Sequence, residues 1–119
     1  MNMRKVRVVN LTRDIILLRE AEVADTFWLR FRGLLGRPFL LSGTGLIIKP
    51  CKAVHTVGMK FPIDVAFVDG GNRICHIIGE MAAFRFSSTI KEAAYVIEAP
   101  AGTFRSMGTV VGDRLRIEE

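Results

Sequence analysis

The segment 63–69 (IDVAFVD) constrains the fold of this chain most, because it shows the side-chain pattern of a strand. Large apolar side chains recur there at every second position, and successive side chains of a strand point to opposite faces. Asp64 would then share a face with Ala66 and Val68. Because an unpaired buried charge is costly, its carboxylate must lie at the rim of the strand or find a buried partner. The segment predicts a strand that carries one carboxylate on a largely apolar face.

The rest of the chain divides into other short segments of this kind, separated by turns. We expect strands at 4–9, 15–23, 73–79, 94–99 and 114–118, with a further apolar strand before Pro50. The turn at 69–72 (DGGN) is the strongest in the chain and predicts a hairpin. Short strands between Gly, Pro and Asn turns favour a sandwich or barrel over a layered α/β fold. We therefore predict a mostly β, compact single domain over residues 1–119, a β-sandwich or barrel-like fold with one short α-helix near residues 25–35.

That helix is expected to begin at Asp25 as N-cap and to stop at Gly36. Its apolar positions recur at helical spacing: Phe27, Phe31, Leu34 and Leu35. The helix should therefore bury its aromatic face and leave Arg30 and Arg32 nearer the edge.

Two further expectations concern residues 74–93. Strict alternation would place Cys75 and His76 on opposite faces of the return strand, so that both could not point into one site. In the connection 80–93, the side chains of Phe84, Phe86 and Ile90 are expected to pack beneath it.

Most of the chemically active side chains lie between residues 51 and 64. They are a thiol (Cys51), an imidazole (His55), a hydroxyl (Thr56), a thioether (Met59) and a carboxylate (Asp64). Residues 51–62 read as irregular chain entering a strand, and loops on a rigid scaffold commonly carry binding groups. Arg30 or Arg37 would offer a guanidinium fork to a carboxylate or phosphate. The candidate ligand-binding residues are Arg30, Arg37, His55, Thr56, Met59 and Asp64. Asp64 is expected to pair with one of the arginines or to orient the His55 ring.

Cys51 and His55 also support an alternative, a small enzyme or a metal-binding protein. A Cys51 nucleophile with His55 as base and Asp64 as orienter has the right residue types. However, no strand-to-helix elbow presents Cys51, and structural zinc sites usually show paired Cys or His motifs that this chain lacks. We therefore favour a binding role over catalysis and expect no metal and no cofactor.

The formal net charge of +5 is concentrated in the N-terminal third. Residues 1–37 carry eight basic and four acidic side chains, and the remainder carries nine and eight. A basic third is a candidate surface for nucleic acid or another polyanion, although solvated strand and helix faces have the same composition. Nucleic acid is thus kept as a further alternative and is not the favoured partner.

No apolar run approaches the roughly 20 residues of a membrane helix, and Ile15–Leu18 is too short for the apolar core of a signal peptide. We expect a cytoplasmic protein without a membrane partner, in which both cysteines are free thiols.

Four motifs also carry a resemblance to a known family. The run CKAVHTVGMKFPIDVAFVD at 51–69 resembles the signature of the domain of unknown function 192 family, a set of uncharacterised small prokaryotic proteins. RFRGLLGR at 30–37, YVIEAPAG at 95–102 and GD at 112–113 follow the family's order. The resemblance covers roughly residues 20–118. It implies a compact, mostly β single domain of the sandwich or barrel kind and no established activity.

Together these observations predict a non-enzymatic binding or accessory domain. Its site is expected around the loop 51–64, with a small anionic ligand or a peptide as the partner. Such a lining also suits a zwitterionic ligand or a chain terminus.

Overall fold

One seven-stranded sheet forms the framework of the protein, in the order β5-β4-β6-β3-β2-β1-β7. The computed structural model describes residues 3–119. The strands are β1 (Arg4–Asn10), β2 (Ile15–Ala24), β3 (Thr44–Ile48), β4 (Ile63–Asp69), β5 (Ile74–Met81), β6 (Ala93–Pro100) and β7 (Leu115–Glu118). All neighbours run antiparallel except β2 and β3, which run parallel.

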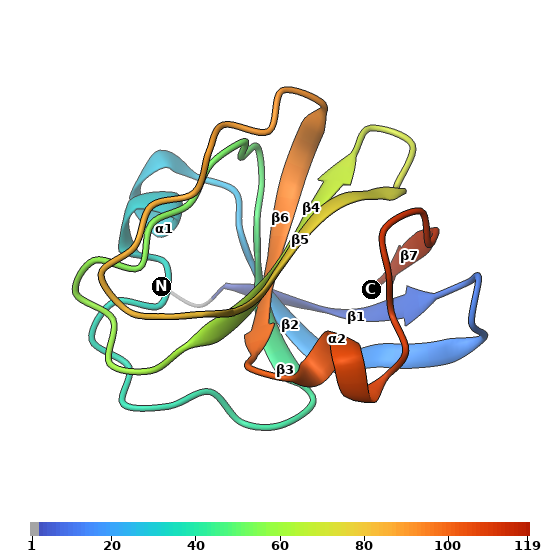
Figure 1. Cartoon of the computed structure of the whole chain (residues 1–119), viewed down its shortest axis with the longest axis horizontal. Helices are drawn as coiled ribbons and strands as arrows, with labels where there is room; N and C mark the ends of the chain where they lie inside the picture. The colour runs from blue at the N-terminus through green and yellow to red at the C-terminus, as the bar shows by residue number, and fades with distance from the viewer. Residues whose placement is uncertain (1–2) are drawn as a thin grey trace.

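The sheet curls until its two edge strands meet at one end (Figure 1). An isolated bridge pairs Arg73, just before β5, with Arg114, just before β7. The backbone N–H of Leu115 donates to the carbonyl of Asn72 at 2.8 Å, beside this bridge. The predicted mostly β, barrel-like fold is therefore confirmed, as a half-closed barrel.

Two apolar cores lie on the two faces of the sheet. The first packs side chains of β1, β2 and β6 against Phe104 and Leu115. The second lies between β3, β4, β6 and the segment 50–62. Strand β6 contributes to both, because Tyr95 and Ile97 belong to the first core and Val96 to the second. This alternation fixes the direction of the side chains from Tyr95 to Ala99.

The helix α1 (Phe27–Arg32) is shorter than predicted and is capped elsewhere. Thr26, not Asp25, is the N-cap, and its hydroxyl accepts a hydrogen bond from the Leu29 N–H at 3.2 Å. The helix ends at Gly33, whose φ of 48° terminates it before Gly36. A second short helix, α2 (Thr103–Ser106), was not predicted. Within residues 3–119, no helix has the length and apolar character that crossing a membrane requires.

The prediction that α1 buries its aromatic face is wrong. Phe27, Trp28 and Phe31 are 75%, 67% and 65% exposed, while Leu29 is the buried residue of the helix. The helix has six residues, all of them large and apolar or basic, so its composition alone did not define which side meets the core. Leu29, together with Leu34 beyond the helix end, packs on the second core.

The expected packing of residues 80–93 is also wrong in part. Phe84 and Phe86 are exposed, and only Ile90 packs on the second core. The backbone of this connection pairs with the segment 52–56, since the Thr56 N–H donates to the Arg85 carbonyl at 2.8 Å and the Ser87 N–H to the Val54 carbonyl at 2.9 Å. Pairing of this kind turns alternate side chains outward.

Strict alternation fails in β5 as well. The register with β4 shifts between the pairs Phe67–His76 and Val68–Ile74, which leaves Cys75 without a partner. Cys75 packs against the second core while Ile74 belongs to the first, and the His76 ring lies 5.6 Å from the Phe67 ring. The bulge therefore removes the predicted opposition of Cys75 and His76.

Candidate functional site

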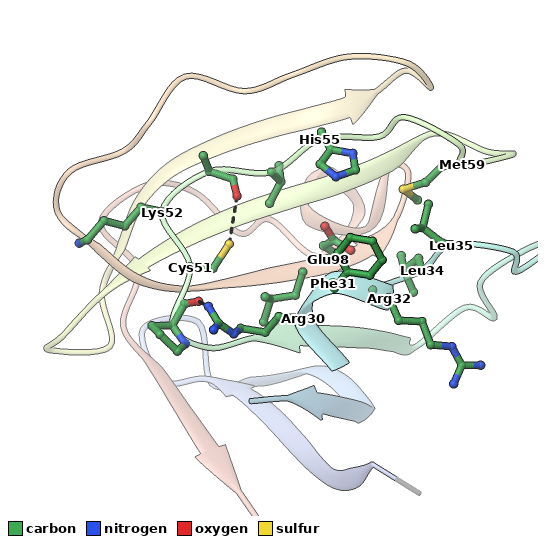
Figure 2. A pocket seen from close by; sticks show the side chains of 15 residues that line it. Arg30, Phe31, Arg32, Leu34, Leu35, Cys51, Lys52, His55, Met59 and Glu98 are labelled. Carbon is green, nitrogen blue, oxygen red and sulfur yellow. Dashed lines mark hydrogen bonds between the residues drawn. The ribbon is translucent and has the colours of Figure 1, made fainter. Parts of the chain in front are cut away.

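A cavity of about 280 Å³ lies between α1 and the segment 50–59, above the second core (Figure 2). Gly33, Leu34, Leu35 and Val54 contribute to its apolar wall, with Phe31 at the side of α1. The polar lining comes from Arg30, Arg32, Cys51, Lys52, His55 and Glu98. A small pocket with an apolar wall and a few polar groups is the usual form of a ligand site.

Glu98 forms the floor of this pocket. Strand β6 is central in the sheet, and Glu98 is paired there with Leu46 of β3 and Val65 of β4. Its side chain points to the face opposite Tyr95 and Ile97, and only 3% of the residue is exposed. In Figure 2 its carboxyl is near the centre of the lining side chains.

No hydrogen bond from residues 3–119 reaches the Glu98 carboxyl. Burial raises its pKa from 4.5 to about 7, and the charge of Arg37 opposes this rise. Desolvation disfavours the charged form of a buried acid, and a partner would restore it. The carboxyl thus faces the pocket as an acceptor that the described part of the protein does not satisfy.

Arg30 supplies the complementary group. Its Nη1 donates to the Pro50 carbonyl at 3.2 Å, which fixes the guanidinium against the loop. Its Nε is buried and has no hydrogen-bond partner within residues 3–119. The pocket therefore contains one buried donor without a partner, which costs free energy, and one carboxyl that is open to a ligand.

Cys51 and His55 line the pocket but do not bond to each other. The Cys51 thiol donates to the Ala53 carbonyl at 3.1 Å, and burial raises the pKa of this thiol. His55 Nδ1 accepts the Val57 N–H at 3.3 Å. A thiol with a raised pKa carries little thiolate, the reactive form. In the described part of the chain, no three His, Cys, Asp or Glu side chains are grouped closely enough to hold a metal ion.

The other predicted site residues lie in different places. Met59 is buried in the pocket wall. Thr56 is fully buried, where its hydroxyl donates to the Ala82 carbonyl at 2.6 Å and holds the loop together. Arg37 does not line the pocket; its Nη2 lies 2.9 Å from the Glu22 carboxylate.

Asp64 has a structural role, with partners that the sequence did not indicate. Its two carboxylate oxygens accept three backbone N–H groups, from Glu80 at 2.8 Å and from Gly102 and Phe104 at 3.0 Å each. The expectation that Asp64 pairs with an arginine or orients His55 is wrong, because these three bonds occupy it on the other face of the sheet. It fastens the start of α2 to β4 and β5.

Four of the basic residues near the N-terminus form ion pairs. The pairs are Arg4 with Glu119 and Asp25, Lys5 with Glu20, Arg7 with Glu118, and Arg13 with Asp113. The positive charge of this third of the chain is therefore partly neutralised by carboxylates that are distant in sequence.

Sequence reasoning missed Glu98 as a site residue. The signal was present, since Glu98 is the one charged residue of the apolar run AAYVIEAP. A carboxylate on an inward face of a central strand needs a partner or a function, and the same argument had been applied only to Asp64.

The chain resembles known proteins along almost its whole length. The model of the DUF192 family, described as "Uncharacterized ACR", matches residues 8–117. A UPF0127 protein of Pyrococcus furiosus is 29% identical over 111 residues, which are 91% of this chain and 95% of that protein. A UPF0127 protein of Thermococcus sibiricus is 27% identical over 91% of this chain and 72% of its own.

Two crystal structures share the fold. One, from Sinorhizobium meliloti 1021, is described provisionally as a transcription regulator; it superposes with a TM-score of 0.84 at 24% identity, over 98% of this chain and 96% of that chain. The other, a protein of unknown function from Novosphingobium aromaticivorans, has a TM-score of 0.82 at 22% identity, over 96% of this chain and 84% of its own. At these identities the likeness shows the fold alone.

Proposed function

This chain belongs to the DUF192 family of uncharacterised proteins, and from that premise we propose that it binds a small zwitterionic ligand in the pocket between α1 and residues 50–59. The observation that carries the proposal is the buried carboxyl of Glu98 on the pocket floor, to which no group of residues 3–119 donates a hydrogen bond. An ammonium or amide N–H of the ligand would satisfy it. A carboxylate of the same ligand would accept a hydrogen bond from Arg30.

Three features support this ligand class. The cavity of about 280 Å³ suits a molecule of the size of an amino acid or a chain terminus. Arg30 and Glu98 have opposite charges. Within residues 3–119, the buried Arg30 Nε has no acceptor and the Glu98 carboxyl has no donor. A purely anionic ligand would leave Glu98 unsatisfied and would be repelled once this acid is ionised, so of the anionic and zwitterionic ligands expected from the sequence, the zwitterion fits better.

Catalysis through Cys51 is the weaker candidate. Burial raises the pKa of the thiol, and His55 makes no hydrogen bond to it. A binding role needs neither group to react. A cytoplasmic setting is part of the proposal, since both cysteines are free thiols.

The test is a thermal-shift and calorimetric screen at about pH 8 with three matched classes of compound: free amino acids and dipeptides, simple carboxylates and phosphate, and simple amines. The first class should stabilise the protein, by about 2.7 kcal/mol at a hundred times the dissociation constant. Glu98→Gln and Arg30→Gln should each remove that stabilisation, and binding to the unmodified protein should weaken below about pH 7, where Glu98 takes up a proton.

Arg105→Gln is the matched control, because Arg105 is exposed and lies outside the pocket. It should bind like the unmodified protein. Equal shifts with amines or carboxylates alone would contradict the zwitterion, as would hits that persist unchanged in both pocket variants.

A further inference from the structure

The mouth of the pocket opens on a surface built from three segments that are distant in sequence, residues 27–35, 50–60 and 82–92. The first two line the pocket together, and a Cβ on Gly58 would lie 3.1 Å from the side chain of Leu35. The third pairs with the second through the bridge between His55 and Phe86. Figure 1 shows α1 and these loops together on the left of the molecule.

Exposed apolar side chains gather on these segments. We call the set the aromatic rim: Phe27, Trp28, Phe31, Val57, Phe84 and Phe86, all exposed. The Trp28 and Phe31 rings stack at 5.9 Å, and the rings of His55 and Phe86 are also 5.9 Å apart. Contiguous exposed apolar groups of this kind usually mark an interaction surface.

The positive charge of the chain is concentrated on the same segments. They contain six basic residues and one acidic residue, Glu92, whereas the remaining residues contain eleven of each sign. The six are Arg30, Arg32, Lys52, Lys60, Arg85 and Lys91. Within residues 3–119 none of the six forms an ion pair, unlike the basic residues of β1. This surface thus carries the whole net charge of +5.

We propose that the aromatic rim and its six basic residues form a docking surface for an anionic lipid bilayer. Aromatic and aliphatic side chains enter the headgroup region while Lys and Arg meet anionic headgroups, and such binding needs no spanning helix. The sequence predicted no membrane partner. The proposal departs from that prediction because the tertiary fold brings together apolar and basic residues that are far apart in the sequence.

Two other occupants fit the observations less well. A second copy of the chain, docked face to face, would oppose two surfaces of the same strong charge. Single-stranded nucleic acid is held along a basic groove with bases stacked on successive aromatic rings. Here the apolar groups lie on three separate segments, do not form a continuous groove, and include the aliphatic Val57.

The experiment is sedimentation of the full chain with vesicles of phosphatidylcholine alone and of phosphatidylcholine with phosphatidylglycerol. We expect binding to the anionic vesicles that weakens with salt and little binding to the neutral ones. Trp28 is the sole tryptophan, so its emission should shift to the blue on binding and be quenched by brominated lipid.

Matched variants separate the two components of the surface. Arg32→Glu with Lys60→Glu should weaken binding by at least about tenfold, whereas Arg105→Glu with Arg114→Glu changes the net charge equally outside the surface and should weaken it less.

Phe27→Ser with Phe86→Ser should also reduce binding and the Trp28 shift, and Val110→Ser with Val111→Ser is its control. All four pairs of changes are at exposed positions, so circular dichroism should show an unchanged fold.

Failure to bind anionic vesicles at low salt would overturn the proposal. An equal loss of vesicle binding in the Arg32→Glu, Lys60→Glu protein and in its Arg105→Glu, Arg114→Glu control would overturn it as well. Binding of a single-stranded oligonucleotide that depends on the same residues, without binding of vesicles, would assign the surface to nucleic acid instead.

Discussion

Replacing Glu98 by Gln isolates the effect of one buried acid on folding. The pKa of Glu98 rises from 4.5 to about 7 in the folded protein because the carboxyl is buried. The folded state therefore binds this proton more tightly than the unfolded chain does. The stability that follows is fully present below about pH 4.5 and is lost as the pH rises through about 7.

The magnitude comes from the size of the shift. One pKa unit corresponds to about 1.4 kcal/mol, so ionisation of Glu98 should lower the free energy of unfolding on the order of 3 kcal/mol between about pH 4 and about pH 8. Gln has nearly the same shape and does not titrate. The Glu98→Gln protein should thus gain about 3 kcal/mol relative to the unmodified protein over this pH range.

The assay is urea unfolding followed by far-ultraviolet circular dichroism at a series of pH values. The difference in the free energy of unfolding between the two proteins is the informative quantity. The titration of all other groups contributes equally to both proteins and cancels, and the desolvation of the Gln amide does not change with pH. Glu92→Gln, at an exposed position, is the control and should show a flat difference.

A flat difference for Glu98→Gln as well would refute the reasoning. It would mean that the carboxyl is solvated or partnered in solution, and the main support for the proposed ligand site would be lost.

Two further predictions concern the framework around the site. Asp64→Asn should lower the free energy of unfolding on the order of 3 kcal/mol, measured by urea unfolding. One of the three backbone N–H groups would face an amide NH₂, and the others would lose the charge of their acceptor. A loss of stability no larger than that of Glu92→Gln would show that the three bonds contribute little. Gly45→Ala should lower the melting temperature strongly, because the added Cβ would lie 2.5 Å from the backbone carbonyl oxygen of Glu98. Gly70→Ala, where nothing lies within 4 Å of a Cβ, should melt near the unmodified protein, and equal melting of the two would disprove the close approach of β3 to β6.

The sequence alone determined the strands and their order along the chain. Alternation at 63–69 and the turn at 69–72 both describe interactions between near neighbours, and β4 and β5 lie where these patterns predicted them. The pattern was weaker for α1, since a helix of six residues rich in Phe, Trp and Arg has no distinct apolar face. There the contact of Leu29 with the second core decided the orientation.

Only the tertiary structure decided which polar groups meet. Asp64 and Glu98 are both buried carboxylates of neighbouring strands, on opposite faces of the sheet, and the sequence did not distinguish their roles. Strand β5 and the turn after β6 bring three backbone N–H groups to Asp64, and within residues 3–119 no donor reaches the Glu98 carboxyl. Arg30 and the loop 50–59 then close over Glu98 from segments that are far away in the sequence. Local periodicity reports which side of a strand a residue occupies, and it does not report what the rest of the chain places on that side.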